Sequence, residues 1–190
     1  MEGERRNVTL LFADVVDSTA LAEKLDPENW TELMSEAFGY LTEPVRAFDG
    51  TVARLMGDGM LAFFGAPTAH EDDPQRAVMA ALQMLDAIRL FAAQVQRSHD
   101  LDFRIRVGIN TGPVVAGIIG ERKFAYDLWG DSVNTASRIE SQGIEDCIQL
   151  TEGTYDRLRA TFVCEARGTI ALKGKAEMRT FLLKRKRVHV

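Results

Sequence analysis

The sequence predicts one α+β domain, in which helices pack on an antiparallel or mixed sheet. Segments with strand spacing and segments with helical spacing follow one another in the order β-α-β-β-α-β, before further elements toward the C-terminus. The length of 190 residues suits a single domain with a sizeable core. Hydrophobic residues at 46% and charged residues at 27% are typical of a folded globular chain. No internal repeat or linker is visible, so we expect one domain over residues 1–190.

The first half of the chain predicts the core of this domain. Helix starts are marked by Asp26-Pro27 and by Asp73-Pro74, because Pro is favoured at the first helical position. The turn residues Gly57-Asp58-Gly59 separate two short strands and indicate a hairpin. The expected elements are a strand over 7–16, a helix over 26–41, a hairpin over 50–65, a helix over 72–91 and a strand over 103–110. This order is the ferredoxin-like (palm-like) arrangement.

The second half predicts additional strands and helices beside that core. A short helix over 132–141 stops at Gly143. Two strands are expected before it, over 113–120 and 123–130. From Ile148 onward the pattern indicates a strand, a helix and a final pair of strands.

Charge and composition exclude some functions. The formal net charge of −5 and the pI near 5.3 argue against a general nucleic-acid binder. No continuous apolar run approaches the ~18 residues of a membrane-spanning helix, and no signal peptide opens the chain, so we expect a cytoplasmic location. Cys147 and Cys164 have no metal-binding spacing and are expected to be reduced thiols.

Asp14 stands in the middle of the apolar stretch LLFADVVDST, residues 10–19. An ionised carboxylate in an apolar strand is costly unless a cation pairs with it. In the predicted arrangement the first strand lies beside the hairpin that carries Asp58 at its tip. Two carboxylates on neighbouring strands are oxygen ligands for a hard cation. The pair therefore predicts a Mg²⁺ or Mn²⁺ site, although Asp58 alone would be an ordinary turn residue.

The residues after Asp14 form a small polar turn that leads into a helix. In such a turn backbone N–H groups can meet phosphate oxygens. The candidate phosphate contacts are Val16, Asp17, Ser18 and Thr19. The chain has no G-x-x-x-x-G-K-[ST] motif, so this is not a P-loop.

A second cluster of polar residues lies in YDLWGDSVNTASRIES, residues 126–141. Asn134 and Arg138 are four residues apart on the short helix and share one face. Asp127 lies on the strand before that helix. These residues are either a surface network or a nucleotide site, in which Asp127 contacts a base and Arg138 stabilises charge on a phosphoryl group.

Five motifs together resemble the class III nucleotidyl (adenylyl/guanylyl) cyclase catalytic domain. They follow the family's order and span about Val8 to Leu183: FADVVDST, RLMGDGMLAFFG, RVGINTGPVVAG, YDLWGDSVNTASRIES and LKGKAEMRTF.

The resemblance implies the site residues and the partners. Two Mg²⁺ or Mn²⁺ ions are expected on Asp14 and Asp58 with the carbonyl of Val15, and Arg106 is expected on the phosphates. The family forms a head-to-tail dimer with active sites between subunits, so a homodimer would hold two sites. The other subunit would supply Arg54 and Asp127 for the base, Asn134 for the ribose and Arg138 for the transition state. Lys173 matches the lysine that contacts the triphosphate.

The hairpin position that reads the base departs from the adenylyl pattern. Adenylyl members usually have a lysine where this chain has Arg54, together with an aspartate, here Asp127. Arginine also matches the O6/N7 edge of guanine. Guanylyl members typically have glutamate at the hairpin and a small residue instead of the aspartate, and this chain has neither. The sequence therefore favours ATP, with GTP or relaxed purine selectivity as the alternative.

Two functions of other classes compete with an adenylate cyclase (a lyase acting in signal transduction). A non-catalytic regulatory dimerisation module would have lost metal or transition-state residues, yet Asp14, Asp58, Asn134 and Arg138 are all present. A diguanylate cyclase would carry a GG[DE]EF-like turn, and the chain has only GDG. Regulatory domains could lie outside this chain.

Overall fold

The computed structural model describes residues 4–119, 125–171 and 177–188, with only the backbone for the part of 117–129 that lies within these ranges. Its elements are β1 (Glu4–Val15), α1 (Ser18–Ala22), α2 (Pro27–Ala47), β2 (Thr51–Leu55), β3 (Gly59–Phe64), α3 (Asp73–His99), β4 (Ile105–Ile119), β5 (Ala125–Trp129), α4 (Asp131–Ser141), β6 (Ile148–Thr151), α5 (Glu152–Leu158), β7 (Phe162–Ile170) and β8 (Met178–Lys186). The predicted β-α-β-β-α-β core is confirmed, with α1 as a short addition after β1.

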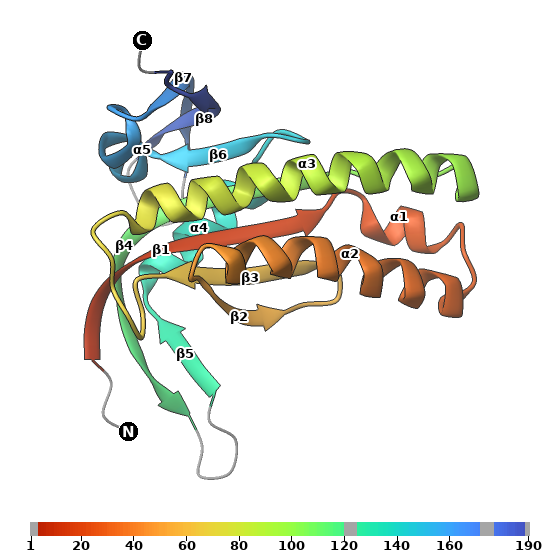
Figure 1. Cartoon of the computed structure of the whole chain (residues 1–190), viewed down its shortest axis with the longest axis horizontal. Helices are drawn as coiled ribbons and strands as arrows, with labels where there is room; N and C mark the ends of the chain where they lie inside the picture. Colours follow the sequence, from red (N-terminus) through yellow and green to blue (C-terminus); the bar gives the residue numbers. More distant parts are fainter. Residues whose placement is uncertain (1–3, 120–124, 172–176, 189–190) are drawn as a thin grey trace.

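One mixed sheet joins all the described strands. Seven of them lie in the order β2-β3-β1-β4-β6-β8-β7, and β5 pairs with the far half of β4. The pairing of β4 with β6 is parallel and the other pairings are antiparallel. Figure 1 shows α2 and α3 crossing one face of the sheet, with α4 behind it and the β4–β5 hairpin extending away from the body.

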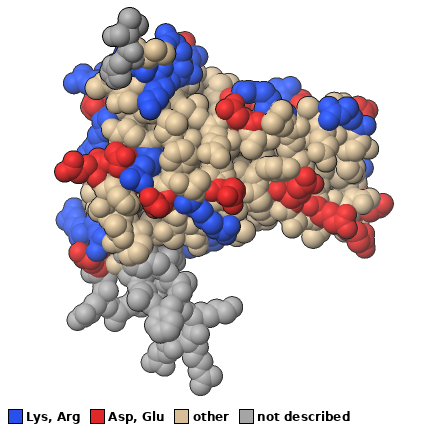
Figure 2. Space-filling view, in the orientation of Figure 1, with Lys and Arg blue, Asp and Glu red and all other residues tan. Residues whose placement is uncertain are grey.

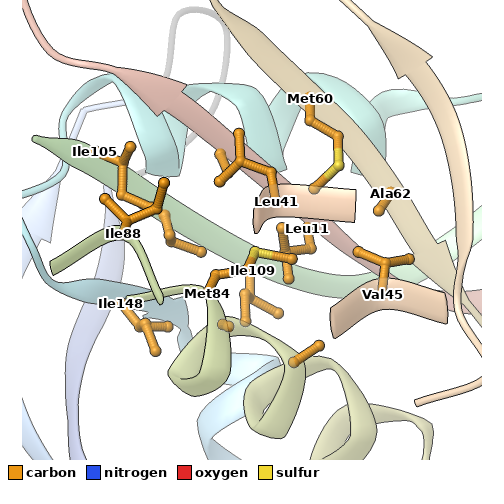
Figure 3. Close-up of a cluster of buried hydrophobic side chains, with 14 of the residues drawn as sticks. Leu11, Leu41, Val45, Met60, Ala62, Met84, Ile88, Ile105, Ile109 and Ile148 are labelled. Carbon is orange, nitrogen blue, oxygen red and sulfur yellow. The ribbon is translucent and has the colours of Figure 1, made fainter. Parts of the chain in front are cut away.

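The two faces of the sheet bury different sets of side chains. Along β1, Leu11 and Ala13 point toward α2 and α3, in the main core. Leu10 and Phe12 point to the opposite face, where a smaller core includes Ala136 of α4. This alternation follows from the two-residue period of a strand. Figure 3 shows the main core, in which side chains from the two long helices meet the sheet.

One helix among the described residues, α3, is long and apolar enough to pass a test for a membrane span, which the core helices of soluble proteins also pass. Its residues Val78, Met84 and Ile88 are buried in the main core.

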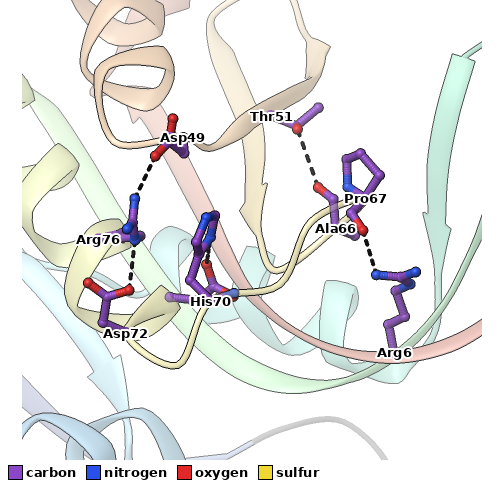
Figure 4. Close-up of polar contacts among 9 residues, drawn as sticks. Arg6, Asp49, Thr51, Ala66, Pro67, His70, Asp72 and Arg76 are labelled. Carbon is purple, nitrogen blue, oxygen red and sulfur yellow. Dashed lines mark hydrogen bonds and ion pairs between the residues drawn. The ribbon is translucent and has the colours of Figure 1, made fainter.

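The loop from β3 to α3 is held by polar contacts (Figure 4). Arg76 on α3 pairs with Asp49 at 2.6 Å and with Asp72 at 2.8 Å. On the other side of the loop, the Arg6 guanidinium donates a hydrogen bond to the Pro67 carbonyl at 2.6 Å. The Arg76 contacts tie the start of α3 to the corner between α2 and β2, and the Arg6 contact ties the loop to β1.

Several element boundaries differ from the expectations, and three differences are the largest. The two strands predicted over 103–110 and 113–120 form one continuous strand, β4, because the intervening Thr111 and Gly112 stay paired with Thr9 and Val8 of β1. Helix α2 continues to Ala47 past the predicted end at residue 41. The helix continues past Pro44, which is buried, although proline has no N–H to donate to the carbonyl four residues before it. Helix α3 starts at Asp73 with Asp72 as its N-cap and continues to His99, beyond the predicted end at residue 91.

Two groups of like-charged residues lie on the surface, among other charges of both signs (Figure 2). Exposed acidic residues lie near α1 and the start of α2, and the end of β8 carries exposed basic residues. Figure 2 shows both groups at the rim of one face. The acidic residues are Glu23, Asp26, Glu28 and Glu32, and the basic ones are Lys184, Arg185 and Lys186.

Candidate active site

Asp14 and Asp58 meet where β1 ends and the β2–β3 hairpin turns. In the register between β1 and β3, Asp14 lies opposite Gly59, directly after Asp58. The Val15 N–H donates to the Asp58 carbonyl at 2.9 Å and holds the turn against β1. Asp14 at the end of β1 and Asp58 in the turn directly before β3 are therefore brought together.

Gly59 is required by the Asp14 carboxylate. A Cβ at this position would lie 2.9 Å from Asp14 Oδ1 and 2.8 Å from the Ala13 carbonyl oxygen. Any side chain at residue 59 would have to displace the carboxylate or the backbone of β1. The glycine thus leaves the space in which Asp14 sits.

The electrostatics of Asp14 fit a cation site. Burial, together with the neighbouring Asp58 carboxylate, raises the pKa of Asp14 from 3.8 to about 6. Asp14 Oδ1 is buried without a hydrogen-bond partner. The described residues contain no group of three or more His, Cys, Asp and Glu side chains that could hold a metal. A cation here would therefore rest on the two carboxylates with backbone or substrate oxygens.

An open pocket of about 360 Å³ surrounds these carboxylates. It is lined by Asp14, Val15, Asp17, Ser18, Thr19, Ala20, Glu23, Asp58 and Arg106. The Ser18 hydroxyl donates to Asp58 Oδ2 at 2.5 Å, which links α1 to the hairpin. Most of the predicted metal and phosphate residues therefore share one pocket.

Val16 differs from the other residues of the predicted phosphate turn. It is not among the residues that line the pocket. Its N–H donates to the Arg104 carbonyl at 2.9 Å and continues the pairing of β1 with the start of β4. That N–H is therefore already occupied by the protein.

Arg106 on β4 lies opposite Asp14 of β1, and its side chain pairs with Glu140 of α4. The Arg106 Nε atom is 3.3 Å from Glu140 Oε1, but neither atom has a hydrogen-bond partner. Burial, and then the charge of Asp14, raises the pKa of Glu140 from 4.5 to about 7, although Arg106 partly offsets this. A buried carboxylate thus stands directly behind the arginine of the pocket.

Helix α4 packs on β4 through two glycines. A Cβ at Gly108 would lie 2.3 Å from the amide nitrogen of Glu140, and a Cβ at Gly112 would lie 2.5 Å from the Ser132 hydroxyl. The Asn110 side-chain amide also donates to the Ser132 carbonyl at 3.0 Å. The helix is therefore held against the strand at both ends.

Asn134 and Arg138 lie on the side of α4 that faces away from the sheet. The buried positions of this helix are Ser132, Thr135, Ala136, Ile139 and Glu140. At 3.6 residues per turn, Asn134 and Arg138 fall on the opposite side, and Asn134 is exposed. Among the residues described, neither of them lines the pocket around Asp14 and Asp58.

Arg54 owes its direction to an irregularity in β2. The register between β2 and β3 shifts between Val52 and Arg54, so that Arg54 lies opposite Leu61. Leu61 is buried in the smaller core on the α4 face of the sheet. Because paired residues point to the same face, the bulge directs the exposed Arg54 side chain toward the α4 face.

Two predicted site residues cannot be placed in this geometry. The backbone of Asp127 pairs with Gly117 in the β4–β5 hairpin, and its side chain lies outside the described part of the structure. Lys173 lies outside the described residues altogether.

Glu140 is the main residue of this region that sequence reasoning missed. The signal was present, because Glu140 follows Ala136 by four residues on the apolar side of a short amphipathic helix. A charged residue on the apolar side of a helix indicates that an oppositely charged group lies nearby in the interior.

The sequence matches the family described as the adenylate and guanylate cyclase catalytic domain over residues 2–185. The chain belongs to this family, the class III cyclases. The chain is 37% identical over 175 residues to an adenylate cyclase of Mycobacterium tuberculosis. The matched region covers 92% of this chain and 39% of that protein. The chain is also 36% identical over 181 residues to the human atrial natriuretic peptide receptor 2, covering 93% of this chain and 17% of that protein. The cyclase domain thus spans well under half of these curated relatives.

Solved cyclase structures share the fold over nearly the whole chain. The adenylyl cyclase CyaB from P. aeruginosa superposes with a TM-score of 0.93 at 28% identity and covers 98% of both chains. The guanylyl cyclase Cya2 gives a TM-score of 0.90 at 33% identity, covering 96% of this chain and 94% of that one. Structures named as an adenylyl cyclase and as a guanylyl cyclase are therefore both close to this domain in fold.

Proposed function

We propose that this domain is an adenylate cyclase, which converts ATP to 3′,5′-cyclic AMP and pyrophosphate at two sites shared between the subunits of a homodimer. One observation carries the proposal. The carboxylates Asp14 and Asp58 converge with Arg106 in one pocket, while Asn134 and Arg138 face away from their own sheet.

That division explains why two copies are needed. A cyclisation site requires groups on the phosphates together with groups on the ribose and the reacting phosphorus. One chain presents these two sets on separate surfaces. A second copy related by a two-fold axis would bring its Asn134 and Arg138 over the Asp14 pocket, and the symmetry would create an equivalent second site.

Two Mg²⁺ or Mn²⁺ ions, when bound, would lower the pKa of the ribose 3′-hydroxyl and neutralise the triphosphate. Asp14 and Asp58, with the Val15 carbonyl, are the residues that would hold them. Arg106 and Lys173 would bind the phosphates, joined by the Asp17–Thr19 turn. Asn134 would orient the ribose, and Arg138 would stabilise the charge that develops on the α-phosphoryl group. A well-placed arginine in phosphoryl transfer is worth about 10³-fold or more in rate.

Adenine selection would come from Arg54 and Asp127. Arg54 would donate to adenine N1, and Asp127 would accept from the N6 amino group. The second candidate is GTP, because the bulge in β2 presents an arginine, whose fork also matches guanine O6 and N7. Relatives named as adenylate cyclase and as guanylyl cyclase are comparably similar to this chain, at 37% and 35% identity.

The test is cyclic nucleotide formation by the purified domain. ATP and GTP are supplied in parallel, with Mg²⁺ or Mn²⁺, across a dilution series of protein. Cyclic AMP with a specific activity that falls on dilution supports the proposal. Predominant cyclic GMP overturns the choice of substrate. The absence of both products at high protein concentration with Mn²⁺ favours a non-catalytic dimerisation module.

Mixing inactive variants tests the shared site directly. Asp14→Asn and Arg138→Ala should each be inactive as homodimers. A heterodimer has one site with both defects and one intact site, so an equal mixture should recover about a quarter of the wild-type activity. Recovery would be absent if both residues acted within one chain.

The longer relatives suggest the setting of this domain. We infer that it works in the cytoplasm, where ATP and Mg²⁺ are abundant, under the control of regulatory domains outside this chain.

A further inference from the structure

Arg106 faces two sets of groups. On one side it lines the pocket with Asp14 and Asp58, and on the other it meets Glu140 at 3.3 Å. The contact with Glu140 is an ion pair without hydrogen-bond alignment, since Arg106 Nε and Glu140 Oε1 are both buried and unpartnered. Buried polar atoms are normally hydrogen-bonded, so this unsatisfied pair needs a physical explanation.

A third unpartnered side-chain atom lies on a strand that pairs with β4. Gln149 on β6 is fully buried and lies next to Gly108 in the register with β4. Gly108 is in turn the residue on which the Glu140 backbone rests. Gln149 Oε1 accepts a hydrogen bond from Arg167, but Gln149 Nε2 has no partner. An amide donor without a hydrogen-bond partner therefore lies on the strand next to β4, level with the glycine on which Glu140 packs.

We propose that Glu140 is a positioning residue that couples the two active sites of the homodimer, by linking Arg106 of one site to the α4 helix that serves the other. The inference rests on the proposed function. A bound triphosphate attracts the Arg106 guanidinium away from Glu140. The released carboxylate then turns toward Gln149, and the last turn of α4 moves with it. Arg138 stands in that same turn and acts in the partner's site.

The coupling makes the two nucleotide-binding steps unequal. The probe is 3′-deoxy-ATP with Mg²⁺, which lacks the attacking oxygen and cannot cyclise, titrated into the dimer by calorimetry. In the wild-type protein the two dissociation constants should differ by about fivefold or more, the usual lower range of allosteric coupling. In Glu140→Gln they should agree within about twofold.

Glu145→Gln is the matched control. Glu145 also pairs with an arginine, Arg104, directly before β4, at 2.6 Å, but both side chains are 43% exposed. An exposed pair has little energetic weight, so this variant should keep the unequal steps. If Glu140→Gln fails to fold, as judged by circular dichroism, Glu140→Asp replaces it, because the shortened side chain cannot reach Arg106.

Kinetics separate positioning from mere structural damage. In Glu140→Gln, Arg106 no longer has a competing anion, so KM for ATP should fall, while the untethered α4 lowers kcat. Both should change by about threefold to tenfold. A variant that only loosened the structure would raise KM.

The outcomes are distinguishable. Equal binding steps in the wild-type protein overturn the coupling and leave the proposed function intact. Unequal steps that persist in Glu140→Gln, or a raised KM, overturn the role of Glu140. Failure of the wild-type protein to bind 3′-deoxy-ATP at all overturns the proposed function and the coupling with it.

Discussion

Gly108 on β4 and Glu140 on α4 are in direct backbone contact. A Cβ at Gly108 would come within 2.3 Å of the Glu140 amide nitrogen and 2.7 Å of its Cα, and neither atom belongs to a flexible side chain. Gly108→Ala must therefore push α4 off the strand. Overpacking of this kind costs about 1–3 kcal/mol, and we expect cyclase activity to fall by more than the loss of folded protein explains. Urea unfolding and product formation by the folded fraction measure the two effects.

Gly39→Ala is the matched glycine substitution. Gly39 is exposed within α2, and a Cβ there would meet nothing within 4 Å. Alanine is a better helix former, so the free energy of unfolding should rise by about 0.5–1 kcal/mol. Activity should stay unchanged. If Gly108→Ala kept both the activity and the free energy of unfolding, as expected for Gly39→Ala, the close packing of α4 on β4 would be contradicted.

The pH dependence of Mg²⁺ binding follows from Asp14. Its pKa in the folded protein, about 6, is above the ordinary 3.8. The folded state therefore binds the proton more tightly than the unfolded state, and this group lowers stability as pH rises from about 4 to about 6. A cation must replace that proton. We expect the Mg²⁺-induced rise in melting temperature to be small at pH 5 and large at pH 8.

Asp14→Asn is the control for this effect. The asparagine does not titrate, and it offers a weaker ligand. The Mg²⁺-dependent rise in melting temperature should be small at both pH values. A rise in the wild-type protein that is equal at pH 5 and pH 8 would show that Asp14 does not hold the ion.

Glu140→Gln should stabilise the protein at pH 8 even though we expect it to lower kcat. The pKa of Glu140 is raised from 4.5 to about 7, so the folded state loses stability as pH rises through that interval. Glutamine does not ionise, so the variant does not lose this stability as pH rises. The gain in free energy of unfolding should be on the order of 2 kcal/mol at pH 8 and should shrink toward pH 5. Urea denaturation at both pH values measures it, and a variant less stable than wild type at pH 8 would contradict the prediction.

The sequence predicted the pocket better than the helix behind it. Asp14 in an apolar strand and Asp58 in a Gly-Asp-Gly turn carry local signals, and the order of strands places them together. The signal of Glu140 is weaker, since it consists only of a charge on the apolar side of a short helix. Its burial depends on Gly108, which is distant in the sequence and adjacent only after β4 and α4 pack. Local patterns show which residues are unusual, and tertiary packing decides what they meet.

The same limit applies to the strand boundaries and to the base-reading residues. Thr111 and Gly112 resemble a break between strands, yet pairing with β1 keeps β4 continuous. The direction of Arg54 depends on a bulge that residue preferences do not indicate. The roles of Asp127 and Lys173 rest on the family resemblance and stay predictions.

Arg54 should decide which purine is used. Arg54→Glu replaces the donor expected at adenine N1 with an acceptor, so kcat/KM for ATP should fall by about 10- to 100-fold, the value of one good base contact. Arg54→Lys keeps a donor and a positive charge, so it should retain ATP turnover within a fewfold margin. Since Arg54 is exposed on an edge strand, neither change should alter stability by more than about 0.5 kcal/mol. Parallel kcat/KM measurements with ATP and GTP test this. If the ratio of kcat/KM for ATP to kcat/KM for GTP were unchanged in Arg54→Glu, the hairpin would not contact the base.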